Sequence, residues 1–368
     1  MKINWDSEVL SSVSKAIHQL EHLSIDLDSI ENTADWLAYE EFSFPKNNQV
    51  RENPEDFIRA TMFMNTLNFA FTDFKTSIKY EVKRGSEILS DSEAMYFQVN
   101  EAVDSGNNLV DGKVMATLTL EQLENIFVGN IEMPMLKERV EILNDVGQKL
   151  VDDYEGDWLN FINNGPKKLY ANGEGLIERL VNEFPRFDDS SEYKGNKVKF
   201  YKLAQLAFWG IHGELSGSNY FKIEDMHSMT AFADYIVPVA LNVMKITTYT
   251  PELDKKIRDG EMIERDSEEE IEIRSASIYA TAILTEKVNE RRPENKSIII
   301  PQLDYRLWKN YHATHHPHTR NQHQARFRQT TQHISAPCFD AHQPQLVGLP
   351  CQIFSRRPPS CHCRVFGQ

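Results

Sequence analysis

Apolar residues recur every three or four positions through most of the first 310 residues, a spacing that places them on one face of a helix. The first predicted helical face carries Val9, Leu10, Val13, Ile17, Leu20 and Leu23. A second repeat runs from Leu136 to Leu150, and a third from Leu176 to Phe184 stops at Pro185, because proline disrupts a helix interior. Helix packing is therefore the main constraint on the fold.

Strand-like alternation is scarce by comparison. The best segments are residues 77–82, 193–200 and 297–300, and all three are short. Thr119 and Gln122 have the spacing of a capping box, which predicts a helix that begins just after Thr119. We therefore expect a mainly α protein with a few short β-strands.

The chain changes character after residue 320. Residues 1–320 carry 35 basic and 54 acidic side chains, a formal charge of −19, whereas residues 321–368 carry five arginines and one acid, a charge of +4. Eight of the twelve histidines lie from His312 onward, without an apolar periodicity long enough to bury a face. We predict one folded domain over residues 1–320 and a disordered tail over 321–368. The tail is either a natural extension or the product of a shifted reading frame or splice junction.

Charge and cysteine content exclude several classes of protein. The acidic body argues against a protein that grips duplex DNA through a generally basic surface. The first cysteine is Cys338, so the body holds neither a disulfide nor a thiolate-rich metal site. The chain has no run of about eighteen apolar residues, and its start lacks the layout of a secretory signal. We expect a cytoplasmic protein that does not bind membranes.

Asp234 is the most conspicuous charged residue within residues 1–320. It lies in the apolar run Met229-Thr-Ala-Phe-Ala-Asp-Tyr-Ile-Val-Pro238, where a carboxylate needs a partner. Pro238 suits the first turn of a helix, so Asp234 is expected just before a helix whose N-terminal dipole favours negative charge. From local sequence alone, a capping or ion-paired aspartate is the commoner interpretation.

Two lysines precede this run in a segment with a helical apolar pattern, Val198 to Trp209, which Gly210 or Gly213 could end. Lys202 lies inside the apolar stretch, where it can meet a ligand anion or the Asp234 carboxylate, although a lysine that reaches out to water is commoner. Near the start of the chain, Asn68 has the paired donors and acceptors that can read the edge of a base. A structural amide is again the commoner case.

Three later groups of residues are each weak evidence for a functional site. Glu272 and Arg274 are close enough in sequence to pair with each other, and Asp304 and Trp308 share one helical face. The histidines at 312, 315, 316 and 318 have the side chains that bind zinc, but their place at the start of the tail favours an adventitious cluster. We therefore predict no metal site.

Taken in order, several of these segments resemble the queuosine salvage protein family, over most of residues 5–320. The segments that carry the resemblance are Thr66 to Phe69, Pro134, Glu138-Arg139, Ile142 to Asn144, Phe200 to Lys202, Ala204-Gln205, residues 229–238, Glu272 to Arg274 and Leu303 to Trp308. After Arg320 the chain departs from the pattern of the family. The resemblance implies a helical fold related to the helix-hairpin-helix DNA glycosylases.

The resemblance also implies an activity: hydrolysis of the N-glycosidic bond of queuosine 5′-phosphate, which releases queuine and ribose 5-phosphate. The substrate is then a small nucleotide rather than a nucleic acid, and no cofactor is required. Asp234 is expected to be the catalytic carboxylate, because a fixed negative charge stabilises an oxocarbenium-like transition state. The residues expected to bind the substrate are Phe232, Tyr235 and Asn68 at the base, Lys199, Lys202 and Arg274 at the phosphate with His315 to Arg320, and Asp304 and Tyr305.

Two other functions fit parts of the same sequence. A noncatalytic helical module could hold a nucleotide or a protein partner in an aromatic pocket, with the His- and Arg-rich tail as an interaction arm. A DNA glycosylase would need a basic groove, which the charge of −19 on residues 1–320 disfavours. Release of a free base separates an enzyme from a binding module.

Overall fold

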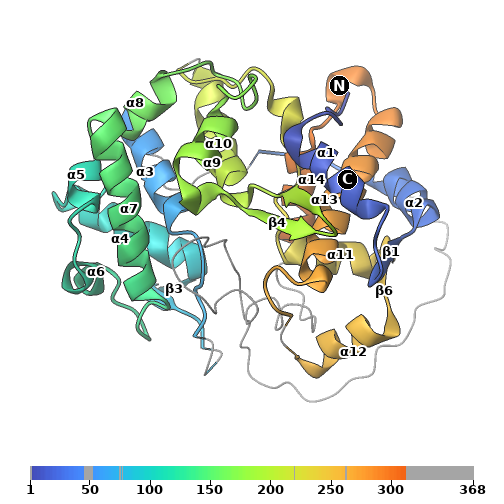
Figure 1. Cartoon of the computed structure of the whole chain (residues 1–368), viewed down its shortest axis with the longest axis horizontal. Helices are drawn as coiled ribbons and strands as arrows, with labels where there is room; N and C mark the ends of the chain where they lie inside the picture. Colours follow the sequence, from blue (N-terminus) through green and yellow to red (C-terminus); the bar gives the residue numbers. More distant parts are fainter. Residues whose placement is uncertain are drawn as a thin grey trace, which may run out of the picture.

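The computed structural model describes residues 2–44, 53–73, 76, 78–218, 220–261 and 263–311, and within them the chain is mainly helical (Figure 1). The helices of the first half are α1 (Glu8–Ile17), α2 (Leu27–Leu37), α3 (Pro54–Thr66), α4 (Asp91–Asp104), α5 (Gly112–Met115), α6 (Leu120–Ile126), α7 (Leu136–Tyr154) and α8 (Trp158–Asn163). Those of the second half are α9 (Leu176–Glu183), α10 (Lys202–Leu215), α11 (Ile236–Val243), α12 (Pro251–Asp259), α13 (Glu268–Glu290) and α14 (Ile300–Tyr311). This confirms the predicted fold class, whereas the relation to helix-hairpin-helix glycosylases stays a prediction.

The described strands form three small antiparallel pairs. They are β1 (Leu23–Ile25) with β6 (Thr247–Tyr249), β2 (Glu81–Arg84) with β3 (Glu87–Ser90), and β4 (Ser190–Tyr193) with β5 (Asn196–Lys199). Lys194 and Gly195, between β4 and β5, have φ angles of 47° and 78°. Positive φ at both central residues is the geometry of a two-residue hairpin turn that matches strand twist. This hairpin delivers the chain to the start of α10.

The long helix α13 connects two parts of the core. In Figure 1, α3 to α8 lie on one side of the molecule, while α1, α2 and α11 to α14 lie on the other. The larger apolar cluster takes in Ile271 and Ile278 of α13, and a second cluster takes in Leu284 and Val288 of the same helix with residues of α2, α11 and α14. Residues 270–278 of α13 are buried without interruption, so this part of the helix is enclosed on all sides. α13 thereby provides the frame for α11 and α14, which carry site residues.

Several predicted elements are confirmed. Helix α7 covers the repeat from Leu136, and α9 ends at Glu183, directly before Phe184 and Pro185. Thr119 and Gln122 make both hydrogen bonds of the capping box ahead of α6. The spacing of apolar residues and the capping chemistry are local, which is why the sequence alone reveals them.

Other predicted boundaries are wrong. The first helical face ends at Ile17, and Leu23 begins β1 instead. The predicted strand at 297–300 is not formed, because the backbone of Ile298 is bonded at both its N–H and its carbonyl by the Asn289 amide, and Ile300 begins α14. The segment from Val198 is a strand before it is a helix, and α10 runs through the two glycines to Leu215. The predicted strand at 193–200 is confirmed only in part, because Tyr193 ends β4, Lys194 and Gly195 form the turn, and the second strand, β5, is Asn196–Lys199.

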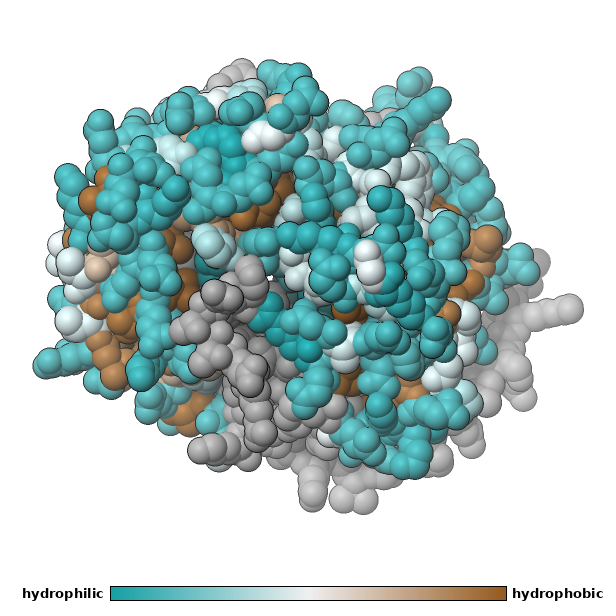
Figure 2. Space-filling model, in the orientation of Figure 1, coloured by the Kyte–Doolittle hydropathy of each residue, from teal (hydrophilic) through white to brown (hydrophobic). Residues whose placement is uncertain are grey.

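The surface in Figure 2 is mainly hydrophilic, with scattered apolar patches. None of the described helices is long and apolar enough to cross a membrane. The predicted tail, 321–368, and the histidines from 312 lie outside the described residues.

Candidate functional site

Lys202 and Asp234 form a buried ion pair at the centre of the candidate site. Lys202 is the first residue of α10, and Tyr201, before it, adopts a left-handed conformation with φ of 51°. The Nζ atom of Lys202 lies 2.8 Å from Oδ2 of Asp234, and the two residues are 4% and 8% exposed. The sequence suggested either a ligand anion or the Asp234 carboxylate as the partner of Lys202. The structure shows the Asp234 carboxylate in that place.

Asp234 also caps the helix that follows it. Its Oδ1 accepts the backbone N–H of Ile236, the first residue of α11, at 2.9 Å. Ala233 precedes it with a φ of 48°, a conformation that non-glycine residues rarely adopt without support. The expectation of an aspartate just before a helix is confirmed, and the carboxylate is fixed by donors on both of its oxygens.

A glutamine holds the start of the loop that carries Asp234. Gln205 lies one turn after Lys202 on α10 and is fully buried. Its Oε1 accepts the N–H of Thr230 at 2.7 Å, and its Nε2 donates to the Thr230 hydroxyl at 3.0 Å. The same helix therefore positions both Lys202 and the loop opposite it. The sequence marked Gln205 as part of a motif but did not indicate this contact.

Asp304 of α14 supports the same loop from the other side. Its Oδ2 accepts the backbone N–H of Phe232 at 3.0 Å, two residues before Asp234, and the side chain is 2% exposed. The pKa of Asp304 is raised to about 7, mainly by burial; the nearby Asp234 carboxylate adds to the rise, and the Phe232 N–H and Lys202 oppose it. Asp304 was predicted to contact the substrate. In the structure it bonds the backbone of the loop that carries Asp234.

This pKa predicts a pH-dependent effect of Asp304→Asn. Asp304 binds its proton more tightly in the folded state than in the unfolded chain, so its contribution to stability is complete below pH 4 and is lost as the pH rises through 7. The asparagine cannot ionise and keeps an oxygen for the Phe232 N–H. Urea unfolding should therefore show the variant gaining stability relative to wild type between pH 4 and pH 8, by up to about 4 kcal/mol.

The exposed Asp145 of α7 provides the control for this measurement. Asp145→Asn makes the same replacement at an exposed position and controls for its general effect on stability. An Asp304→Asn curve that runs parallel to wild type would contradict the interpretation, because it would show that Asp304 titrates alike in the folded and unfolded states.

Arg274 lies in a second buried ion pair next to Lys202. Its Nη2 is 2.6 Å from Oδ2 of Asp189, and this same oxygen accepts the backbone N–H of Lys202 at 3.2 Å. The guanidinium stacks 3.9 Å from the ring centroid of Phe200 and is 3.6 Å from Glu270. These contacts favour a role in anchoring the start of α10. No local sequence pattern marks Asp189, because its partner Arg274 is 85 positions away in the chain.

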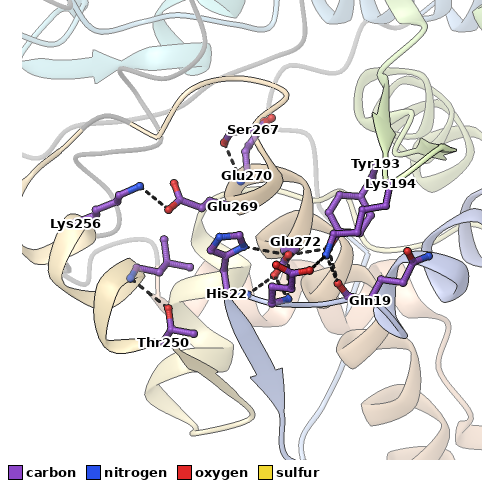
Figure 3. A network of polar contacts seen from close by, with 12 residues as sticks. Gln19, His22, Tyr193, Lys194, Thr250, Lys256, Ser267, Glu269, Glu270 and Glu272 are labelled. Carbon is purple, nitrogen blue, oxygen red and sulfur yellow. Dashed lines mark hydrogen bonds and ion pairs between the residues drawn. The ribbon is translucent and has the colours of Figure 1, made fainter.

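The expected pair between Glu272 and Arg274 is wrong, and Glu272 instead anchors a separate network (Figure 3). The buried Glu272 carboxylate accepts the backbone N–H groups of Glu21 and His22 and the Tyr193 hydroxyl, and it contacts His22 Nδ1 at 3.1 Å. Oxygens and a ring nitrogen of His22, Glu268 and Glu272 lie within 4.8 Å of one another. Because the Glu272 oxygens already serve several hydrogen-bond donors, this network is adequately explained as a structural one.

Three aromatic residues predicted to contact the substrate lie on the segment that carries Asp234 or on α14. Phe232 packs near Trp209, at 6.4 Å between ring centroids, and Tyr235 is buried with Ile236 against Trp308 and Tyr311. Tyr305 stacks on Trp308 at 6.4 Å. Phe232, Tyr235 and Asp304 thus belong with the Lys202–Asp234 pair, and Tyr305 lies next to Asp304 in α14.

Lys199 and Asn68 have partners of their own. The Lys199 amine contacts Glu8 at 2.5 Å, and Asn68 Nδ2 donates to the Tyr96 hydroxyl at 3.3 Å. Next to Asn68, the buried Arg139 donates to the carbonyls of Leu67 and Ala70, which fixes the loop after α3. The stretch from His315 to Arg320, also predicted at the phosphate, lies outside the described residues.

Comparison with known proteins places this arrangement in a family. Residues 47–332, which include Lys202, Asp234 and Asp304, match the sequence profile of the family described as queuosine salvage protein. The chain belongs to the queuosine salvage protein family. The match covers more than half of the chain and confirms the resemblance noted from its motifs.

Individual members of the queuosine salvage protein family are similar over most of their length. The chain is 32% identical to the queuosine 5′-phosphate N-glycosylase/hydrolase of Mus musculus, over 67% of this chain and 73% of the relative. The protein of that name from Sphaerobacter thermophilus is 27% identical, over 82% of this chain and 91% of the relative. The protein of that name from Schizosaccharomyces pombe is 28% identical, over 77% of this chain and 81% of the relative.

Proposed function

We propose that this protein hydrolyses the N-glycosidic bond of queuosine 5′-phosphate and releases queuine and ribose 5-phosphate. Membership of the queuosine salvage protein family and the names of the relatives support this activity. The observation that carries the proposal at the level of residues is the buried Lys202–Asp234 pair. Burial of a carboxylate is costly, and it is commonly retained where the charge performs chemistry.

In the proposed mechanism, Asp234 stabilises the positive charge that develops on the sugar as the bond from C1′ to the base breaks. Water adds to C1′ as the base departs, the water loses a proton, and the base gains one. A carboxylate held by Lys202 and by the Ile236 N–H is preorganised, so it needs little rearrangement in the transition state. Queuine is a 7-deazaguanine without an N7 to protonate, and its departure must be assisted through its other polar atoms.

The roles proposed for the other site residues rest on where each one lies in the structure. Phe232, Tyr235 and Tyr305 are proposed to offer aromatic surface to the base, with Asn68 at its polar edge. Lys202 and Lys199 are proposed to supply positive charge toward the phosphate, and Arg274 to act through the start of α10. Gln205 and Asp304 are proposed as positioning residues, because each bonds the backbone of the loop that carries Asp234.

The direct test is a product assay with the full chain. Queuosine 5′-phosphate, queuosine and GMP are incubated separately with the protein, and free base is measured by chromatography. We expect release of queuine from queuosine 5′-phosphate, slower release from queuosine and none from GMP. Saturable binding of queuosine 5′-phosphate without release of queuine would instead identify the noncatalytic binding module.

A further inference from the structure

A polar hollow of about 420 Å³ lies between the N-terminal segment and the loop before α9. Its lining residues are Asn4, Asp6, Ser7, Glu8, Lys168, Tyr170, Ala171, Asn172 and Glu178. The volume falls within the range of small-molecule sites, and Lys202, Asp234 and Asp304 are not among the lining residues. The hollow is thus separate from the site proposed for hydrolysis.

Two hydroxyl groups that line this hollow are buried without a hydrogen-bond partner, Ser7 Oγ and Tyr170 Oη. Ser7 is 3% exposed and is the N-cap residue of α1, yet its side chain makes no capping hydrogen bond. Unpaired buried hydroxyls are unfavourable for folding and are uncommon in native proteins. A second described hollow, lined by residues such as Arg59 and Asp157, contains no such group.

The charges around the hollow determine what kind of molecule fits it. Lys168 is the one lysine among the lining residues and lies 3.5 Å from Glu224, whereas Asp6, Glu8 and Glu178 bring three carboxylates to the lining. Burial raises the pKa of the Tyr170 hydroxyl well above its usual value, and the nearby carboxylates of Glu8, Asp225 and Glu178 add to the rise. A negatively charged ligand would meet the same carboxylates, whereas a sugar hydroxyl can both donate to and accept from Ser7 and Tyr170.

We propose that this hollow is a binding site for a small, uncharged polyhydroxylated molecule of the size of a pentose. Ser7 and Tyr170 line the hollow, and their unpaired hydroxyls bond the hydroxyl groups of the ligand. The ligand thus provides the hydrogen bonds that the two hydroxyls lack within the protein. The site does not depend on the proposed hydrolase activity.

The test uses ribose as the probe and the Ser7→Ala/Tyr170→Phe variant of the full chain. Saturation-transfer NMR should show saturable ribose binding to the wild type and at least a fivefold weaker affinity for the variant. Ribonate, which has a similar carbon chain and a carboxylate, should bind the wild type more weakly than ribose. Absence of saturable ribose binding, equal binding to the variant, or preference for ribonate would each overturn the proposal.

The control replaces a buried, unpaired hydroxyl that lies elsewhere. Thr281 of α13 is fully buried, its Oγ1 has no hydrogen-bond partner, and it does not line the hollow. Thr281→Val should therefore leave ribose binding unchanged. Without ribose, the double variant should melt no earlier than wild type, because neither hydroxyl bonds the protein. A lower melting temperature would show that the hydroxyls serve the fold and would also overturn the proposal.

Discussion

Asp234→Asn should lower the turnover number for queuosine 5′-phosphate at least about a thousandfold, while the dissociation constant of the substrate changes by less than about fivefold. The asparagine has nearly the same shape and keeps an oxygen for the Ile236 N–H, so the start of α11 is preserved. It lacks the negative charge that the transition state requires. Single-turnover release of queuine gives the rate, and the dependence of that rate on enzyme concentration gives the dissociation constant.

Asp157 offers a closely matched control for Asp234. It also caps a helix by accepting the N–H two residues ahead, that of Leu159, and it also pairs with a cation, Arg59. Asp157→Asn should reduce stability without a comparable loss of turnover. If Asp234→Asn retains near wild-type turnover, Asp234 has no role in the chemistry, and the proposed mechanism fails even if the protein is a hydrolase.

The parts of this fold that sequence could predict are those fixed by near neighbours. The repeat in α7, the Thr119 capping box and the position of Asp234 before a helix all depend on residues within about one or two turns. The Lys202–Asp234 pair was one of three interpretations of Lys202, and the commoner one, a lysine that reaches out to water, is wrong because the side chain is buried. A lysine within an apolar helix pattern and an aspartate within an apolar run both need a polar partner.

The supports of the site could not be predicted in the same way. Asp189 joins Arg274 to the Lys202 backbone, and Asp304 reaches Phe232 across 72 positions of sequence. Side chains that bond a distant backbone leave no periodic signal, because the partner N–H group belongs to every residue type except proline. The strand predicted at 297–300 is wrong for a similar reason. The Asn289 side-chain amide bonds the N–H and the carbonyl of Ile298, which a neighbouring strand would otherwise bond.

Lys202→Met should both destabilise the fold and abolish most of the activity. Methionine fills much of the same apolar volume but cannot donate a hydrogen bond, which leaves the buried Asp234 carboxylate without its ion-pair partner. Loss of one member of a buried ion pair costs about 3–5 kcal/mol. We expect a decrease of this size in the free energy of urea unfolding at pH 8, together with at least about a hundredfold loss of turnover.

The variant Lys202→Met/Asp234→Asn separates these two effects. Removal of both charges should restore at least about 2 kcal/mol of the stability lost in Lys202→Met, because no unpaired charge remains buried. Turnover should stay as low as in Asp234→Asn, since the carboxylate is absent. The exposed Lys255–Asp259 pair is the control, and Lys255→Met should cost less than about 1 kcal/mol. A double variant no more stable than Lys202→Met would show that the two charges do not stabilise each other, and the preorganised carboxylate would lose its physical basis.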